Sequence, residues 1–354
     1  MPDKEKKVTE MTGSGHCIEA GLTVRDAMKE IDNVTPKIVF LVVGEKLAAS
    51  LTDGDVRRFL LKGGQLTDPA LDAANHHPLT AANRQEAEEL YHRRNYVAIP
   101  IVRQNGEIVD IYLGEDNSEQ FEALSIPVVM NAGGRGTRLE PYTKILPKPL
   151  IPVGELPIAE HIMRRFEAFG CCQFSIIVNY KKELIKAYFA DSEQKYDITW
   201  YDEETPLGTG GGLCYLKGKL NGTFFFTNCD NLLLSNYASI LRFHRESHNV
   251  ITMICAYKNF VIPYGVVHMG LDGAIESMQE KPELSYLTNT GIYLVEPEVL
   301  EDIEDGVSVG FPDILAKQLA KGRKVAVYPV SENEWLDMGQ LEELERMRGK
   351  LYGE

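Results

Sequence analysis

The sequence predicts an α/β protein of two parts, in which the larger part holds a mostly parallel sheet with helices on both faces. Three observations predict this fold class. From residue 126 onward, short apolar runs alternate with amphipathic stretches of helical period. A glycine-rich segment follows the first of these runs and an aspartate follows another, at the position where ligands of parallel sheets bind. Ahead of them, residues 18–116 repeat one pattern of helix and strands, with corresponding positions about 60 residues apart.

The composition is that of an ordinary globular protein and excludes several function classes. The 354 residues favour two domains over one, and 44% hydrophobic with 25% charged residues is typical of a soluble protein. No apolar run approaches the ~20 residues that cross a bilayer. Residues 1–14 lack the apolar core of a secretory signal and are expected to be a disordered lead-in. The net charge is −15, with acidic residues in excess in both halves, so no basic face for nucleic acid is expected. We therefore expect a cytoplasmic protein that binds neither nucleic acid nor membrane.

The first part contains two copies of one unit. The first copy predicts a helix at 24–31 and strands at 38–43 and 47–51, and the second predicts a helix at 84–91 and strands at 97–102 and 108–112. One copy cannot bury its sheet alone, so we expect the two copies to pack together. The pattern, with Leu51-Thr52-Asp53-Gly54-Asp55 as its most specific segment, resembles a tandem pair of CBS domains. The pair would occupy 15–120, with its first domain at about 15–72 and its second at about 73–120.

The resemblance to CBS pairs implies a nucleotide site in this part. Thr52 and Asp55 of the first copy, and Asp116 of the second, would hold the ribose or phosphate of an adenine or guanine nucleotide. Two alternatives stay open: Thr52 or Asp53 caps a helix that begins near Val56, or the pair is a dimerisation element without a ligand. CBS pairs often dimerise, so the resemblance also implies a homo-oligomer.

In the second part, strands and helices alternate almost to the end of the chain. The runs that predict strands lie at 126–130, 174–178, 198–201, 223–227, 250–256 and 325–329. The stretches that predict helices lie at 158–169, 182–189, 237–247, 311–321 and 341–350. Strands that alternate with helices form a largely parallel sheet, whose ligands bind at the carboxyl ends of the strands.

The segment Gly133-Gly134-Arg135-Gly136-Thr137-Arg138 follows the first of these strands. Three glycines after a strand allow a tight turn, and their N–H groups can form a concave nest that binds anions. Arg138 and Lys148 add positive charge in a chain that is acidic overall. The residues predict a phosphate-binding loop, and a tight turn without a ligand is the alternative.

This segment and five others, in the same order, resemble the signature of sugar-1-phosphate nucleotidyltransferases, which have a Rossmann-like nucleotide-diphospho-sugar transferase fold. The resemblance covers about 126–345, within a domain at 125–354. The segments are Gly134-x-Gly136-Thr137-Arg138-Leu139 with Pro147-Lys148-Pro149, Leu207-Gly208-Thr209-Gly210-Gly211, Asn228-Cys229-Asp230, Tyr264-Gly265-Val266-Val267 with Glu280-Lys281-Pro282, Asn289-Thr290-Gly291-Ile292-Tyr293, and Trp335-Leu336-Asp337-Met338-Gly339.

The resemblance implies a role for individual residues. Those implied to bind the nucleotide are Gly133, Gly134, Gly136, Thr137, Gly208 and Thr209. Those implied to act on the reacting phosphates are Arg138, Lys148, Asp230 and Lys281, with Asp230 and Asp337 as ligands of Mg2+. Those implied to bind the sugar phosphate are Gly265, Glu280, Lys281 and Asn289. Alternatives without a ligand are a flexible loop at 207–212, a cap for the helix near Tyr237 at Asp230, a solvated ion pair at Glu280 and Lys281, and a turn residue at Asp337.

The implied reaction is attack of a sugar 1-phosphate oxygen on the α-phosphorus of a nucleoside triphosphate, which gives a nucleoside diphosphate sugar and pyrophosphate. The nucleophile is already an anion, so no general base is required. Positioning and charge neutralisation should therefore dominate catalysis. Mg2+ fits this task as a hard cation that prefers oxygen ligands and phosphates.

The substrates are implied only by resemblance. The pattern looks closest to the mannose-1-phosphate guanylyltransferase type, which favours GTP and a hexose 1-phosphate. The fusion to a CBS pair resembles a bacterial group that includes glucosamine-1-phosphate guanylyltransferases of the legionaminic acid route, and this implies a role in surface-glycan or lipopolysaccharide sugars. UTP, dTTP and CTP are alternative nucleotides. A non-catalytic nucleotide sensor is an alternative of another class.

Overall fold

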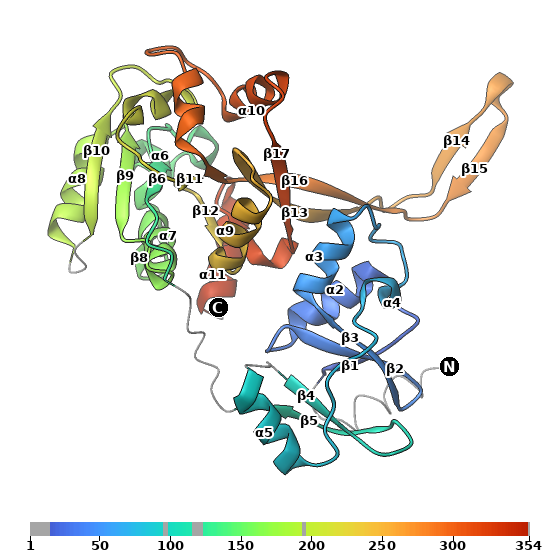
Figure 1. The fold of residues 1–354 in the computed structure, drawn as a ribbon. Coiled ribbons are helices and arrows are strands. Elements are labelled where there is room, and N and C mark those ends of the chain that lie inside the picture. Colours follow the sequence, from blue (N-terminus) through green and yellow to red (C-terminus); the bar gives the residue numbers. More distant parts are fainter. Residues whose placement is uncertain (1–14, 95–97, 115–122, 193–195, 353–354) are drawn as a thin grey trace. The chain divides into compact units, whose positions relative to one another are not determined.

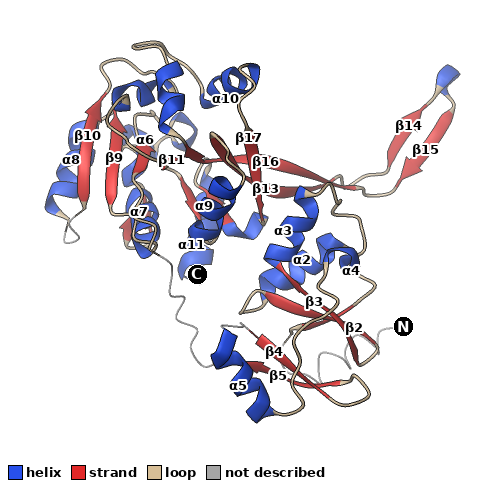
Figure 2. Ribbon diagram, in the orientation of Figure 1, coloured by secondary structure: helices blue, strands red, loops and turns tan. Residues whose placement is uncertain are grey.

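The computed structural model describes residues 15–94, 98–114, 123–192 and 196–352. The chain divides into two compact units, Met1–Glu119 and Gln120–Glu354 (Figure 1). Both units combine helices with strands (Figure 2). Within the described ranges, no helix combines the length and the apolar character that a membrane span requires.

The smaller unit contains the two copies of the repeat. Its elements are β1 (Cys17–Glu19), α2 (Val24–Asn33), β2 (Ile38–Val43), β3 (Lys46–Thr52), α3 (Asp53–Leu61), α4 (Ala70–Ala73), α5 (Arg84–Arg94), β4 (Ala98–Val102) and β5 (Ile108–Leu113). In each copy a helix precedes an antiparallel strand pair, β2 with β3 or β4 with β5, and both pairs have a register shift near the same end. Phe40 and Val42 of the first pair share a buried core with Ala98 and Ile111 of the second. The two copies therefore pack together, as the repeat predicts.

Helix α3 begins at Asp53, earlier than the predicted start near Val56, because Thr52 caps it. The Asp55 N–H donates to Thr52 Oγ1 at 3.2 Å, and the Thr52 N–H donates to Asp55 Oδ2 at 3.0 Å. These reciprocal bonds form a capping box. The Thr52 hydroxyl also donates to Asp55 Oδ2 at 2.6 Å. The structure therefore confirms the capping alternative for Thr52, while Asp116 lies outside the described residues.

The larger unit is built from short strands and helices that follow the predicted alternation. Its strands are β6 (Val128–Asn131), β7 (Pro152–Val153), β8 (Leu156–Pro157), β9 (Gln173–Val178), β10 (Asp197–Asp202), β11 (Phe224–Asn228), β12 (Asn231–Leu233), β13 (Ile251–Val261), β14 (Val266–Met269), β15 (Ile275–Gln279), β16 (Glu283–Val295), β17 (Val325–Val330) and β18 (Trp335–Asp337). Its α-helices are α6 (Tyr142–Ile145), α7 (Ile158–Ala168), α8 (Lys182–Asp191), α9 (Tyr237–Glu246), α10 (Phe311–Ala320) and α11 (Leu341–Tyr352). Its 3₁₀ helices are η1 (Thr137–Leu139), η2 (Lys148–Leu150), η3 (Gly211–Leu216), η4 (Leu271–Gly273), η5 (Pro297–Asp302) and η6 (Glu332–Glu334).

Seven strands form the central sheet in the order β10-β9-β6-β11-β16-β13-β17. Strands β10, β9, β6 and β11 pair in parallel, as do β13 and β17. Strand β16 runs antiparallel to both of its neighbours, β11 and β13. The sheet is therefore mostly parallel, as predicted, and mixed because β16 returns through it.

Helices cover both faces of this sheet. Side chains alternate along β6, so Val128 and Met130 lie in one core and Val129 lies in the other. The first core includes residues of α7, α8, α9 and α11, and the second includes residues of α10, η3 and η5. The prediction of helices on both faces is confirmed.

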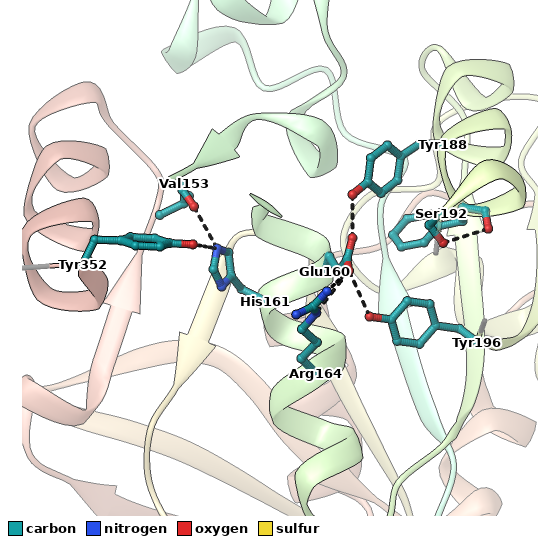
Figure 3. Close-up of polar contacts among 9 residues, drawn as sticks. Val153, Glu160, His161, Arg164, Tyr188, Ser192, Tyr196 and Tyr352 are labelled. Carbon is teal, nitrogen blue, oxygen red and sulfur yellow. Dashed lines mark hydrogen bonds and ion pairs between the residues drawn. The ribbon is translucent and has the colours of Figure 1, made fainter. Parts of the chain in front are cut away.

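A buried carboxylate fixes α7 to its neighbours (Figure 3). Glu160 is only 2% exposed and accepts hydrogen bonds from the Tyr188 hydroxyl at 2.5 Å and from Arg164 at 2.8 Å. The Tyr196 hydroxyl donates to it at 3.4 Å, and burial together with the Glu160 charge raises the pKa of Tyr196 to about 12. A buried charge is stable only with such partners. This network therefore joins α7 to α8 and to the start of β10.

Candidate active site

The carboxyl ends of β6 and β11 meet at one edge of the sheet, because the two strands are parallel neighbours whose last pair is Asn131 with Asn228. The glycine loop follows β6 and Asp230 follows β11. Two cavities lie here, and both are lined by Arg138, Thr209, Asn228 and Asp230. We call them the loop cavity, of about 260 Å³, and the aromatic cavity, of about 290 Å³.

The glycine loop forms one wall of the loop cavity through Gly134, Gly136, Thr137 and Arg138. Gly136 has a φ of +63°, and a Cβ at this position would lie 2.9 Å from Thr143 Cγ2. The Thr143 hydroxyl donates to the Gly136 carbonyl at 3.0 Å, which holds the turn. Arg138 lies in the next turn, η1, and lines both cavities. The loop therefore has the compact, glycine-dependent shape that phosphate binding requires.

Gly133 does not line either cavity and instead packs against a buried carboxylate. A Cβ on Gly133 would lie 2.7 Å from Glu203 Oε2, and one on Gly212 would lie 2.7 Å from Glu203 Oε1. Glu203 is 4% exposed, and burial raises its pKa against a hydrogen bond from the Leu207 backbone. Among the described residues, nothing hydrogen-bonds to Glu203 Oε1. The two glycine-rich segments thus enclose an acceptor that lacks a donor.

Lys148 and Asp230 form an ion pair in the wall of the loop cavity. The Asp230 carbonyl accepts from the Met338 N–H at 2.9 Å, and β12 pairs with β18 so that Asn231 stands opposite Asp337. This pairing brings Asp230 and Asp337 together although they are far apart in the sequence. The alternative in which Asp230 caps α9 is wrong, because Asn236 accepts from the Ser239 N–H in that role.

The charges of these residues affect one another. Burial, and then the Asp230 charge, raise the pKa of Asp337 to about 6, against the opposing effects of Lys148 and Arg138. Burial is the largest single effect and lowers the pKa of Lys148, but Asp230, Cys229 and Asp337 together outweigh it and the net shift is upward. Lys148 therefore stays a charged ammonium, whereas Asp337 is protonated more readily than an exposed aspartate.

The two aspartates fit a divalent cation of the Mg2+ class. Both line the aromatic cavity, and burial, followed by the Asp230 charge, raises the pKa of Asp337. The described residues contain no group of three or more His, Cys, Asp or Glu side chains arranged for a metal. Mg2+ typically takes only one or two carboxylates and completes its ligands with water and substrate phosphates.

The second glycine-rich segment is held in place by the chain before α10. Gly208 has a φ of +79°, and a Cβ there would lie 2.7 Å from the Val309 carbonyl. The Thr209 hydroxyl accepts from the Phe311 N–H at 3.0 Å, and Thr209 lines both cavities. Gly208 lines neither, but its carbonyl accepts from Asn131 Nδ2 at 3.4 Å. The segment at 207–212 is thus anchored to its surroundings.

The aromatic cavity contains Asn289 and Asp337 together with a stack of rings. Tyr293 and Phe311 stack with ring centroids 3.8 Å apart. Asn289 Nδ2 donates to the Tyr293 hydroxyl at 2.6 Å, and its Oδ1 accepts from the Gly291 N–H at 2.9 Å. These contacts orient the Asn289 amide at the cavity wall.

Gly265, Glu280 and Lys281 are not brought to these cavities. They lie where the β14–β15 hairpin joins the outer ends of β13 and β16, and none of them lines either cavity. The hairpin projects beyond the central sheet (Figure 1). Of the residues implied for substrate and metal, the structure leaves Gly133, Gly208, Gly265, Glu280 and Lys281 outside the cavity walls. It brings the others to them, namely Gly134, Gly136, Thr137, Arg138, Lys148, Thr209, Asp230, Asn289 and Asp337.

Several functional candidates were missed by sequence reasoning. Asn131, Asn228 and Asn231 line the cavities and follow or end buried strands, which is the signal that could have identified them. Glu203 directly follows β10 and carries the same signal. The Trp335 indole donates to Asn231 Oδ1 at 3.3 Å, and only the strand pairing could reveal this contact.

Comparison with known proteins places this unit in a family. The family described as Nucleotidyl transferase matches residues 126–352. The mannose-1-phosphate guanylyltransferase of Mycobacterium tuberculosis is 32% identical over 226 residues, which are 62% of this chain and 63% of that protein. The UTP–glucose-1-phosphate uridylyltransferase of Synechocystis is 31% identical over 243 residues, which are 62% of each chain.

The fold has solved counterparts. The crystal structure of HddC from Yersinia pseudotuberculosis matches with a TM-score of 0.51 at 21% identity, over 64% of this chain and 99% of that one. The chain spans about three fifths of the length of the curated relatives it matches. On the match over residues 126–352, the chain belongs to the nucleotidyl transferase family.

Proposed function

We propose that this chain transfers a nucleotidyl group from a nucleoside triphosphate to a sugar 1-phosphate, with release of pyrophosphate. The observation that carries the proposal is that Arg138, Lys148, Asp230 and Asp337 meet at the loop and aromatic cavities. The relatives named above are sugar-1-phosphate nucleotidyltransferases for two different bases. A site of this kind can hold a triphosphate on one side of the shared wall and a sugar phosphate on the other.

Each residue has a task that follows from its position. The N–H groups of the glycine loop and Arg138 bind the β- and γ-phosphates, which leave as pyrophosphate. Lys148 binds the α-phosphate, where negative charge accumulates. Asp230 and Asp337 hold Mg2+, which neutralises phosphate charge when bound. Asn289 holds a sugar hydroxyl in the aromatic cavity.

We further propose that GTP is the favoured nucleotide. Glu203 supports this choice. Its buried Oε1 has no hydrogen-bond donor among the described residues, and Gly133 and Gly212 of the two glycine-rich segments pack against its carboxylate. Guanine offers an N1–H and a 2-amino group side by side, and a carboxylate can accept from both. Uracil and thymine offer one N–H flanked by carbonyl groups, which a carboxylate repels. UTP, dTTP and CTP are the alternatives.

The experiment is a panel of the four triphosphates against mannose, glucose and glucosamine 1-phosphates, with Mg2+ and a pyrophosphate readout. Turnover with GTP is expected, and absence of turnover with every pair would leave the sensor alternative. Glu203→Gln should lower kcat/KM for GTP about 10- to 100-fold relative to UTP, since hydrogen bonds to a charged group contribute about 1.5–3 kcal/mol. Glu204→Gln, at an exposed neighbouring position, is the control and should leave kcat/KM unchanged for both GTP and UTP.

For the smaller unit we propose a regulatory nucleotide site on a CBS-like pair, at about 15–120. Thr52 and Asp55 stand at the N-terminus of α3, where a ribose or phosphate can bind. A place in legionaminic acid or other surface-glycan sugar synthesis is proposed on the domain combination. Calorimetry of the full chain with AMP, ATP and GTP tests the site. If the only binding heat is that of the triphosphate substrate, the proposed regulatory site is rejected.

A further inference from the structure

A small two-stranded ribbon, formed by β12 and β18, supports the candidate metal site. Asn231 of β12 lies directly opposite Asp337 of β18. Side chains alternate along a strand, so Asn231, Trp335 and Asp337 share one face of the ribbon, and all three line the aromatic cavity. Leu232 and Leu336 take the other face and are buried in the core. The ribbon therefore brings an amide and an indole into the cavity beside a candidate metal ligand.

Asn231 connects the indole of Trp335 to the carboxylate of Asp230. The indole N–H donates to Asn231 Oδ1 at 3.3 Å, and Asn231 Nδ2 donates to Asp230 Oδ1 at 3.1 Å. An indole nitrogen can only donate, so it binds the oxygen end of the amide and turns the NH2 end toward the carboxylate. Asn231 and Asp230 are both buried, so water competes little for the second bond. The amide is thus held in one orientation.

The backbone of β16 packs against the same amide. Gly291 lies at the register shift between β16 and β13, and it has a φ of +77°. A Cβ at this position would lie 2.8 Å from Asn231 Nδ2 and 2.6 Å from Asn228 Nδ2. Glycine adopts this conformation without strain and leaves room for both amides. Packing therefore fixes the Asn231 amide in addition to its hydrogen bonds.

The two carboxylate oxygens of Asp230 have different partners as a result. Oδ1 accepts from the Asn231 amide, whereas Oδ2 faces the Lys148 ammonium. In the proposed function Lys148 binds the α-phosphate, which leaves Oδ2 to the divalent cation. Mg2+ demands near-octahedral geometry, which suits a carboxylate that offers one oxygen, whereas Ca2+ also accepts both oxygens of a carboxylate. The arrangement at Asp230 thus favours the smaller ion.

We propose that Asn231 is a positioning residue that occupies Asp230 Oδ1, so that Asp230 binds the divalent cation through Oδ2 alone, and that Trp335 fixes Asn231 in this role. The inference rests on the proposed function, in which Asp230 and Asp337 hold Mg2+. It assigns selectivity for Mg2+ over Ca2+ to a residue that need not touch the metal. Outer partners of metal ligands typically contribute about 10- to 100-fold to metal affinity.

The deciding experiment compares Mg2+ and Ca2+ binding by the wild-type chain and by Asn231→Ala. Each metal chloride is titrated alone in a calorimeter, so the result does not depend on turnover. The variant should bind Mg2+ about 10-fold more weakly. Its affinity for Ca2+ should fall less, because the released Oδ1 can join Oδ2 on the larger ion. A ratio of the two affinities equal to that of the wild-type chain would overturn the proposal.

Trp335→Phe tests the second link, because it keeps an aromatic ring and removes the N–H. By itself it should weaken Mg2+ binding several-fold, since the Asn231 amide can then turn. In the Asn231→Ala background it should have no further effect, because there is no amide left to orient. Equal effects in both backgrounds would show that Trp335 acts by a route that does not include Asn231, and would overturn this part of the proposal.

Asn249→Ala is the matched control for the loss of a buried amide. Asn249 is 3% exposed, its Nδ2 donates to Thr252 Oγ1 at 3.0 Å, and it lines neither cavity. This variant should lose stability in urea and keep both metal affinities.

The outcomes separate this inference from the proposed function. Wild-type protein that binds Mg2+, with an Asn231→Ala variant that binds it equally well, rejects this inference alone. Wild-type protein that binds neither cation rejects it together with metal binding by Asp230 and Asp337. Absence of turnover with every substrate pair rejects the proposed function even where the metal selectivity changes as expected.

Discussion

Asp337→Asn is expected to stabilise the metal-free protein at pH 7 while it abolishes turnover. Asp337 is partly buried, and burial together with the Asp230 charge raises its pKa from 3.8 to about 6. At pH 7 the carboxyl is ionised in the folded and the unfolded chain, but ionisation is less favourable in the folded one. The difference corresponds to about 3 kcal/mol of lost stability, which asparagine would relieve in large part.

The pH dependence tests the cause. As the pH falls from 7 through 6, folded Asp337 binds its proton before the unfolded chain does, so the wild-type protein regains stability. The advantage of the variant should therefore be largest above pH 6 and small near pH 4. Urea unfolding in chelator at pH 7.5, 6 and 4.5 measures this.

Asp191→Asn is the control for the charge change alone. It removes an exposed carboxylate at the end of α8, and should alter stability by less than about 0.5 kcal/mol at every pH. A destabilised Asp337→Asn variant, or a gain that is the same at all three pH values, would refute the reasoning.

Three further outcomes are expected. Lys148→Met should lower kcat about 10²- to 10³-fold in a pyrophosphate-release assay, because it removes a charge beside the α-phosphate; a change in KM alone would contradict this role. Glu160→Gln should lower the free energy of unfolding in urea by about 1.5–3 kcal/mol, since Tyr188 and Arg164 lose a charged acceptor; unchanged stability would show that the network in Figure 3 contributes nothing net. Thr52→Ala should cost the smaller unit about 1 kcal/mol through loss of its cap and weaken nucleotide binding in calorimetry; a stability loss with intact binding would leave Thr52 as a cap only.

The buried elements were predictable because burial imposes a simple pattern on them. Strand β2 has the predicted bounds, β9 begins one residue earlier than predicted, and β11 is shifted by one residue at both ends. Their apolar runs are continuous because both faces of the sheet are covered. The start of α3 was misplaced because Thr52 and Asp55 set it through hydrogen bonds that the hydrophobic pattern does not record.

Elements without a buried pattern could not be found in this way. Strands β14 and β15 are exposed along most of their length, so their sequence shows no continuous apolar run. Strands β12 and β18 are short, and their pairing joins Asn231 to Asp337 across the whole fold. Such long-range pairing is a property of the packed chain and leaves no local signal.

The site residues show the same difference between what the sequence predicts and what only the packed structure reveals. The convergence of Lys148, Asp230 and Asp337 agrees with the roles that the motifs imply. Asp230 follows β11, Asp337 ends β18 beside β12, and Lys148 begins η2 after the glycine loop. The buried acceptor at Glu203 was missed, since its surroundings come from two glycine-rich segments that are distant in sequence. The position of Lys281 could not be predicted, because it depends on how far β16 extends as a strand.

The charge balance of the metal-free site explains why Lys148 contacts Asp230 rather than solvent. Two carboxylates, Asp230 and Asp337, face two cations, Lys148 and Arg138, so the wall is close to neutral without substrate. In the proposed reaction a divalent cation takes over the carboxylates and the triphosphate takes over Lys148 and Arg138. Each charge then exchanges one partner for another of the same sign. No charge is left buried without a counter-charge, a state that would cost several kcal/mol. The side chains are held before substrate arrives in nearly the places where they act, and this is the condition under which fixed charges contribute most to catalysis.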